Sequence, residues 1–313
     1  IGIIRISGPH SVEIATRLFH PHKAASPFKS HYLYYGVLVD PEDGHTVDEV
    51  LLSHMAKPRS YTREDVVEIN CHSGPVALQE VLNVVLKAGA RLAEPGEFTR
   101  RAFINGRLDL AQAEAVVDLI ESKSTAGLRH ASGQLQGMFS QEVALLKEGL
   151  MEILSVLEAS IDFPEEDIEP FSPPQLIADV EHLISHIDKL VNTYAEGRLY
   201  REGVSAVIAG KPNVGKSSLF NALLGEERTI VTSLPGTTRD FVEEVIAISA
   251  IPLIITDTAG LRDSSDSIEE EGVRRTKDKL DQADLIMLVI DGSLDWDSMD
   301  VALDVPKGKK VLA

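Results

Sequence analysis

Two alternating patterns of apolar positions run through the first part of the chain. Four segments rich in β-branched and aromatic residues are typical of strands: residues 1–8, 32–40, 47–55 and 65–72. Between and after them, residues 11–19 and 75–89 place apolar side chains three and four positions apart, which predicts helices. We therefore expect a small α/β domain over residues 1–93.

The strand pattern is absent from residues 94–199, where the spacing of apolar residues is helical. Asp109 and Gln112 have the spacing of a variant capping box, in which each side chain accepts a hydrogen bond from the other residue's backbone. We expect one continuous helix over 124–161, ended by a proline- and acid-rich stretch, and another over 174–199. These segments predict an all-α helical domain.

The last of these helices carries an apolar stripe that needs packing partners. Its members recur at helical spacing: Leu176, Ile177, Val180, Leu183, Ile184, Ile187 and Leu190. A helix bundle is the simplest interpretation, because facing helices would bury such a stripe.

The pattern changes again over residues 200–313. A buried strand, a loop and a helix are followed by two strands that can pair and by one more buried strand. This order predicts the start of a doubly wound α/β domain. Residues 309–313 resemble the start of a further strand, so we expect the domain to be truncated there.

The loop after the first strand of this domain carries a phosphate-binding motif. Residues 210–217 read Gly-Lys-Pro-Asn-Val-Gly-Lys-Ser, a full G-x-x-x-x-G-K-S. Its glycines let backbone N–H groups and the helix N-terminus face phosphate oxygens. Lys216 would bridge the β- and γ-phosphates, and Ser217 would bind Mg²⁺. The expected nucleotide contacts are Gly210, Asn213, Val214, Gly215, Lys216, Ser217 and Ser218.

Two further segments follow in the order of GTPase switch regions. In "PGTTRD", Thr238 offers a hydroxyl to Mg²⁺ and an N–H to the γ-phosphate. In "DTAG", Asp257 would hold Mg²⁺ and Gly260 would sense the γ-phosphate. The expected contacts in these segments are Thr232, Thr237, Thr238, Asp257, Thr258, Ala259 and Gly260.

This set of three motifs distinguishes between classes of protein. A small-molecule kinase would share only the first motif. A glycine-rich loop that arose by chance would lack the strand before it and the helix after it. The fold class is therefore α/β, with a small N-terminal α/β domain, an all-α domain and a truncated Ras-like P-loop G domain. A guanine-specifying N-K-x-D motif is expected one strand later, beyond residue 313.

One position departs from a Ras-type site. Leu261 stands where such an enzyme has the Gln that orients the attacking water. An aliphatic side chain cannot orient water. Either hydrolysis is inefficient or its chemistry is supplied from another residue.

The net charge and the cysteine content restrict the binding partners and the cellular compartment that we expect. The chain has 30 Lys and Arg against 49 Asp and Glu, a net charge of −19, which disfavours stand-alone binding to a phosphate backbone. Its only cysteine is Cys71, so we expect no intrachain disulfide and a reducing, cytoplasmic setting. No apolar run has the length of a membrane span, so we expect no membrane partner.

Three stretches together resemble one family. They are "EPGEFTRRAFINGRLDLAQAEAVVDLIES" (94–122), "SIDFPEEDIE" (160–169), and "GTTRD" followed by "DTAGLRD". Their order over the whole chain is similar to that of the MnmE (TrmE) family of bacterial tRNA-modification GTPases, within the TrmE-Era-EngA-like group. The resemblance implies an N-terminal folate-binding and dimerisation domain (1–93), a helical domain (94–199) and a G domain (200–313).

The resemblance also implies an activity. Members of the family work with the partner MnmG, in a heterotetramer-type complex, to place an aminomethyl-type group on the wobble uridine of tRNAs. The implied cofactors are GTP as substrate, Mg²⁺, K⁺ and a one-carbon folate such as 5-formyltetrahydrofolate. A homodimer is implied, with tRNA bound mainly together with the partner.

Family resemblance further suggests what replaces the missing Gln. Glu269 would bridge through water to the attacking water, although a capping role at a helix N-terminus is the alternative. A K⁺ ion would take the place of an arginine finger, and Arg239 is the alternative finger. The implied K⁺ ligands are Asn213, Thr232, Leu234 and Thr237.

Four residues are the folate candidates that the resemblance implies. Glu68 can pair with the donor edge of a pterin, and Arg5 suits a glutamate tail or a formyl oxygen. Arg101 and His72 complete the set, although each of the four can equally be a surface charge. We expect Cys71 to be buried and structural, because the family's reactive cysteine belongs to a C-terminal tail outside this chain.

Two other functions stay open at this point. An Era- or Der-like regulatory GTPase would act in ribosome or RNA assembly without modification chemistry. A folate-dependent transferase with a vestigial G domain would not need an intact phosphate loop.

Overall fold

A computed structural model describes residues 1–23, 27–162, 173–210, 214–226, 243–257, 280–292 and 310–312. The chain forms two compact units, Ile1–Val116 and Val117–Ala313. The domain bounds expected from the sequence stay predictions.

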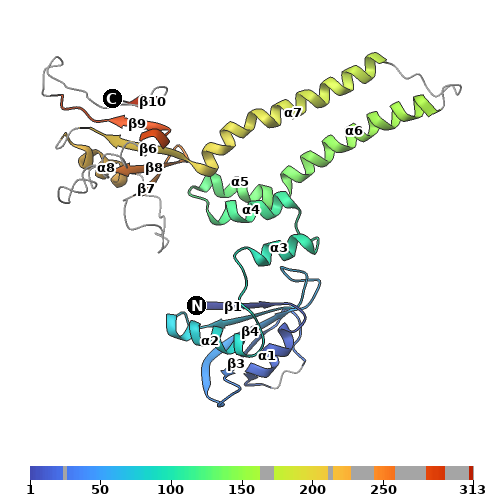
Figure 1. Cartoon of the computed structure of the whole chain (residues 1–313), viewed down its shortest axis with the longest axis vertical. Coiled ribbons are helices and arrows are strands. Elements are labelled where there is room, and N and C mark those ends of the chain that lie inside the picture. Colours follow the sequence, from blue (N-terminus) through green and yellow to red (C-terminus); the bar gives the residue numbers. More distant parts are fainter. Residues whose placement is uncertain are drawn as a thin grey trace. The chain divides into compact units, whose positions relative to one another are not determined.

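The first unit contains a five-stranded antiparallel sheet in the order β1-β5-β4-β3-β2 (Figure 1). Its elements are β1 (Gly2–Ser7), α1 (Ser11–Leu18), β2 (Phe19–Pro21), β3 (Leu33–Val39), β4 (Thr46–Met55), β5 (Val66–Cys71) and α2 (Pro75–Lys87). The four strands and two helices expected from the sequence are confirmed. The short strand β2 was not predicted, because three residues are too few to show a periodicity.

Alternation along the strands separates the two faces of this sheet. One face joins α1 and α2 in a single core that includes Leu18, Leu52, Ile69 and Val81, all with no exposed surface. Cys71 belongs to this core, and its burial raises the pKa of the thiol, as expected of a structural cysteine.

The other face of the sheet keeps apolar side chains exposed. Between 39% and 60% of the surface of each is accessible, and they come from β1, β3 and β4: Ile3, Leu33, Tyr35 and Leu51. Arg5 lies on the same face of β1, directly across from Glu68 of β5. This face therefore combines apolar and charged groups.

The first unit ends in α3 (Glu97–Ile104) and the first part of α4 (Leu110–Ile120). The capping box ahead of α4 is confirmed. The Gln112 N–H donates to Asp109 at 2.8 Å, and the Asp109 N–H donates to the Gln112 side chain at 3.0 Å. These two bonds satisfy backbone donors that no helical turn can satisfy.

After the end of α4, the second unit contains helices α5 (Thr125–Leu135), α6 (Met138–Asp162) and α7 (Pro173–Glu202). The single helix expected over 124–161 is wrong. The chain breaks at Gly137, whose φ of 88° lies in the left-handed region, so that α5 ends there and α6 starts anew. A pattern of apolar spacing does not show this break, because apolar residues, Leu135 and Met138, stand on both sides of Gly137.

Figure 1 shows α6 and α7 lying side by side as two long helices. Leu183 of α7 packs over Gly149 of α6, where an added Cβ would lie 3.0 Å from the leucine. The expected stripe on α7 is only partly covered within the described residues, since Ile177 and Ile184 remain more than half exposed.

The second unit also contains a sheet in the order β10-β9-β6-β8-β7. Its elements are β6 (Val204–Ala209), α8 (Lys216–Glu226), β7 (Glu243–Ile248), β8 (Ile251–Asp257), β9 (Leu285–Leu288) and β10 (Lys310–Leu312). All pairings are parallel except that of the edge strand β7 with β8. This arrangement confirms the doubly wound α/β domain.

Candidate functional site

The phosphate loop lies between β6 and α8. Lys216 is the first residue of α8, is 8% exposed, and its Nζ donates to the Gly210 carbonyl at 3.0 Å. The amine therefore reaches back across the loop from the start of the helix. Ser217 and Ser218 are exposed on the first turn of α8, where free N–H groups and the helix dipole favour an anion.

Gly210 adopts a backbone conformation that residues with a side chain rarely adopt. Its φ is 152°, and a Cβ there would lie 2.4 Å from the Val289 carbonyl oxygen, which follows β9. The Val289 N–H in turn donates to Ala209 at 2.8 Å. Gly210 therefore lies close against the chain that follows β9, and only glycine fits at this position.

Strand register brings the second switch motif to the same edge of the sheet. Ile208 of β6 lies beside Asp257, the last residue of β8, and the two strands are parallel. Parallel neighbours end at one edge, so "DTAG" begins beside the start of the phosphate loop. Sequence spacing does not predict this juxtaposition, because the register of β8 depends on packing across the sheet.

Many of the predicted site residues lie outside the described ranges. They are Asn213, Thr232, Leu234, Thr237, Thr238, Arg239, Thr258, Ala259, Gly260, Leu261 and Glu269. Gly210, Val214, Gly215, Lys216, Ser217 and Ser218 are described, as is the backbone of Asp257.

A second candidate site is a pocket of about 520 Å³ in the first unit. Its lining residues come from the exposed sheet face, the loop before β5 and the chain after α3: Arg5, Met55, Pro58, Arg59, Ser60, Tyr61, Arg63, Val66, Glu68 and Arg107. Its size lies within the range of small-molecule sites. Four arginines and one carboxylate make it suited to a ligand that carries negative charge.

Two of the four folate candidates share this pocket. The Arg5 Nε donates to Glu68 at 2.7 Å, and the Arg5 guanidinium also lies 5.8 Å from the centre of the Phe98 ring. His72 lies beyond the other end of β5, where Asp48 accepts from its backbone N–H and contacts its ring at 2.8 Å. The structure therefore separates His72 from Arg5 and Glu68.

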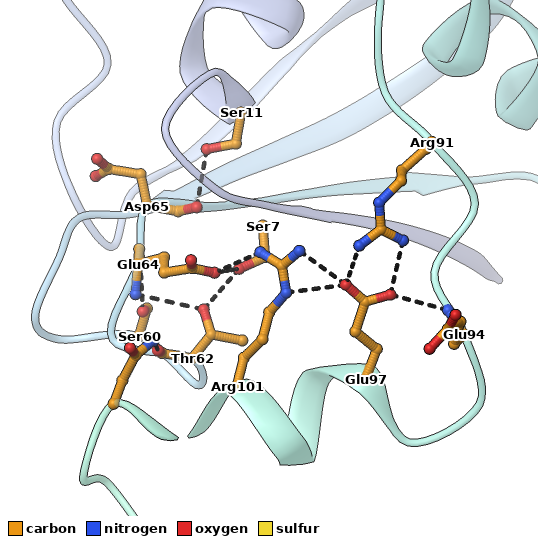
Figure 2. Close-up of polar contacts among 11 residues, drawn as sticks. Ser7, Ser11, Ser60, Thr62, Glu64, Asp65, Arg91, Glu94, Glu97 and Arg101 are labelled. Atoms are coloured by element: carbon orange, nitrogen blue, oxygen red, sulfur yellow. Dashed lines mark hydrogen bonds and ion pairs between the residues drawn. The ribbon is translucent and has the colours of Figure 1, made fainter. Parts of the chain in front are cut away.

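Figure 2 shows Arg101 in an ion-pair network. Arg101 does not belong to the residues that line the pocket. Its Nε and Nη2 donate to Glu97 at 3.0 and 2.7 Å, and its Nη1 donates to Glu64 at 3.0 Å. Arg91 donates to Glu97 from the other side at 2.9 and 2.5 Å. Glu97 is 4% exposed, so α3 presents one buried carboxylate between two guanidinium groups.

The same network holds the loop that lines the pocket. The Glu64 carboxylate also accepts from Ser7 at 2.8 Å, and Ser7 shares a 2.6 Å hydrogen bond with Thr62 (Figure 2). Asn105, just after α3, donates to the Thr62 carbonyl at 2.6 Å. Arg101 therefore acts on the pocket through Glu64 and its neighbours.

These contacts give a pH-dependent contribution to stability. The hydrogen bonds from Arg91, from the Glu94 backbone and from Arg101 hold the pKa of Glu97 well below its usual value. A lowered folded-state pKa stabilises the fold above the ordinary pKa of Glu, about 4.3. That stabilisation is lost as the pH falls below this value towards the folded-state pKa.

We expect the Glu97→Gln variant to unfold at a temperature roughly 5 °C or more below that of the parent chain at pH 7. Between pH 7 and pH 3 its melting temperature should fall less than that of the parent, because the variant no longer titrates there. Circular dichroism melts of the full chain measure both. Glu94→Gln, three residues earlier in the segment ahead of α3 and largely exposed, is the control. Equal pH slopes for parent and Glu97→Gln would contradict the assignment.

The sequence did not single out three of the pocket arginines or Tyr61. Arg59 and Arg63 share the loop before β5, and Arg107, from the chain after α3, meets them only in the fold. The one local signal was "KPRSYTRED", in which basic residues flank a tyrosine within a polar loop.

Strand, phosphate loop and helix in a mostly parallel sheet define the class of protein: a P-loop nucleotide-binding protein with an additional α/β domain and a helical segment. None of the helices in the described ranges has both the length and the apolar character of a bilayer crossing.

Comparisons with known proteins identify the family. The model for "GTP-binding protein TrmE N-terminus" matches residues 1–107, and that for "MnmE helical domain" matches residues 110–306. The tRNA modification GTPase MnmE of Geobacter sulfurreducens is 51% identical over all 313 residues, which cover 68% of that protein. The protein of the same name from Syntrophotalea carbinolica is 50% identical with the same coverage. The chain therefore belongs to the MnmE family.

A solved structure was also similar in sequence. The G domain of the T. maritima FeoB iron transporter is 33% identical over 34% of this chain and 68% of its own. The TM-score of 0.25 is too low to support any statement about the fold.

Proposed function

We propose that the chain binds GTP with Mg²⁺ and hydrolyses it. The observation that carries this proposal is the phosphate loop itself, with buried Lys216 bonded back to Gly210 at the edge of the sheet where Asp257 ends β8. The proposed Mg²⁺ ligands are Ser217, Thr238 and Asp257, the last through water. Relatives that are half identical over the full chain are named as GTPases, which supports the same activity.

Hydrolysis without the Ras-type Gln requires another way to orient water. We propose Glu269 for this role, acting through a bridging water. A K⁺ ion held by Asn213, Thr232, Leu234 and Thr237 would neutralise the charge that develops between the phosphates. Arg239 would then couple the first switch to the nucleotide and would not serve as the finger.

Turnover of GTP and ATP, each in KCl and in NaCl at equal ionic strength, tests the proposal. We expect GTP hydrolysis in KCl to exceed that in NaCl by at least about tenfold, because Na⁺ is too small to span the same oxygen ligands. ATP hydrolysis should be slow in both salts. Equal rates in KCl and NaCl would reject the K⁺ site, and equal turnover of ATP would reject guanine specificity.

We further propose that the pocket of the first unit binds a one-carbon folate. The Glu68 carboxylate can accept the N–H donors of a pterin edge, and Arg5 lies within 2.7 Å to fix the orientation of that carboxylate. Arg101 becomes a positioning residue in this proposal, because all three of its guanidinium nitrogens donate to Glu64 or Glu97. His72 lies away from the pocket and is not retained as a ligand.

In the cell, the folate and the GTPase cycle would serve tRNA modification. We propose a homodimer through the first unit, supported by the apolar side chains that the sheet leaves exposed. With the partner MnmG and bound tRNA, the complex would place an aminomethyl-type group on the wobble uridine. An Era- or Der-like switch gains no support from the two family models, since both describe parts of this one family.

A further inference from the structure

Three arginines at the pocket of the first unit differ from the other arginines around them. We call Arg59, Arg63 and Arg107 the arginine rim. Residues 1–116 contain eight arginines, and the five outside the rim each have a carboxylate partner: Arg5, Arg17, Arg91, Arg100 and Arg101. Among the described residues, no salt bridge joins any member of the rim to a carboxylate.

The rim is also unusual for so acidic a chain. Residues 1–116 carry 12 Lys and Arg against 14 Asp and Glu, so that the strong negative charge of the whole chain, 30 against 49, lies mainly elsewhere. Within this nearly neutral part, four arginines and only one carboxylate line one pocket. A local excess of positive charge in a concave site attracts anions.

Contacts with backbone carbonyls and with the Tyr61 ring hold two members of the rim, Arg107 and Arg63, without neutralising their charge. The Arg107 Nη1 donates to the Tyr61 carbonyl at 3.2 Å, and its guanidinium lies 4.6 Å from the centre of the Tyr61 ring. The Arg63 Nη1 donates to the Asn105 carbonyl at 3.1 Å. Each guanidinium has five N–H donors, so most of its donors stay available to a ligand.

The loop that carries Arg59 and Arg63 is itself held in place. The Ser60 hydroxyl donates to the Glu64 carbonyl at 2.5 Å, and Asn105 donates to the Thr62 carbonyl at 2.6 Å. A ligand therefore meets positive groups whose backbone is already ordered, which lowers the entropy cost of binding.

Glu68 restricts which anion fits. Its carboxylate lies in the same pocket, so a ligand must present hydrogen-bond donors at Glu68 and several negative charges at the rim. In a phosphodiester chain each nucleotide carries one charge beside the donors of its own base, so the charges are not gathered away from the donor groups. A neutral ring system with a tail of carboxylates has both.

We propose that the arginine rim binds the carboxylates of a poly-γ-glutamate tail, so that the pocket prefers polyglutamylated folate to the monoglutamate. The inference rests on the folate binding proposed above and specifies the form of the ligand. Guanidinium groups suit it because they bind carboxylates in bidentate pairs.

Titration calorimetry on the full chain tests the inference with 5-formyltetrahydrofolate bearing one, three or five glutamates. We expect affinity to rise roughly tenfold from one to five glutamates, since each partly exposed ion pair adds a factor of only a few. The gain should shrink in 0.5 M salt, which screens exposed charges.

Substitutions locate the effect. Arg59→Gln should reduce the gain from tail length about two- to fivefold, and Arg59→Gln combined with Arg63→Gln should remove most of it. Arg59 is exposed, so its loss should leave the melting temperature unchanged. Arg17→Gln removes the same charge from α1 and should leave the gain intact.

The outcomes distinguish a preference for polyglutamylated folate from folate binding itself. If one and five glutamates bind equally, the inference is overturned and folate binding stands. If no folate binds at any tail length, the folate proposal fails and the inference fails with it. If a single-stranded RNA hexamer loses affinity in Arg59→Gln while tail length has no effect, the rim contacts RNA and the inference is again overturned.

Discussion

The Lys216→Ala variant is expected to lose GTP affinity by roughly 100-fold or more, with hydrolysis falling below detection at ordinary GTP concentrations. The Lys216 amine is buried at the start of α8 and donates to the Gly210 carbonyl, within the loop that would surround the phosphates. In the proposed complex this amine bridges the β- and γ-phosphates, so the substitution removes a positive charge from both. Titration with a fluorescent, non-hydrolysable GTP analogue measures the effect.

A matched control separates phosphate binding from general charge. Lys189→Ala removes an exposed lysine from α7 and should bind the analogue as the parent does. Circular dichroism melts check that both variants fold, because Lys216 also contacts the loop backbone. Unchanged affinity in a folded Lys216→Ala chain would show that the loop does not bind phosphates in this way.

The second large effect is expected at Glu269. Glu269→Ala should slow GTP hydrolysis in KCl by about 100-fold or more, a typical contribution of a group that positions the reacting proton or water. GTP affinity should stay within about twofold, because the ground-state contacts come from the phosphate loop and Mg²⁺. Single-turnover hydrolysis and analogue titration measure the two quantities separately.

The neighbouring residue provides the control. Glu270 follows Glu269 in the acidic run Glu269-Glu270-Glu271, so Glu270→Ala removes the same charge from nearly the same place. If the run only favours a helix N-terminus, the two substitutions should have similar, small effects. Near-normal turnover in Glu269→Ala would reject the catalytic assignment and leave the missing Gln unexplained.

Local sequence patterns predicted most of the fold, where each element carries its own signal. The capping box at Asp109 and Gln112 is an example, since both partners lie within one helical turn. The break at Gly137 was missed because a glycine between two apolar helices is compatible with a continuous one until packing selects its conformation.

The sequence by itself determined the phosphate loop, because Gly210 to Ser217 are contiguous and their chemistry depends on local backbone geometry. Only the tertiary structure decided the second site. Strand register placed Arg5 beside Glu68, whereas His72 and Arg101 took other partners. The arginine rim likewise exists only after folding, since the chain must bring Arg107 back to the loop of Arg59 and Arg63. Contacts between distant residues depend on packing, which no local pattern encodes.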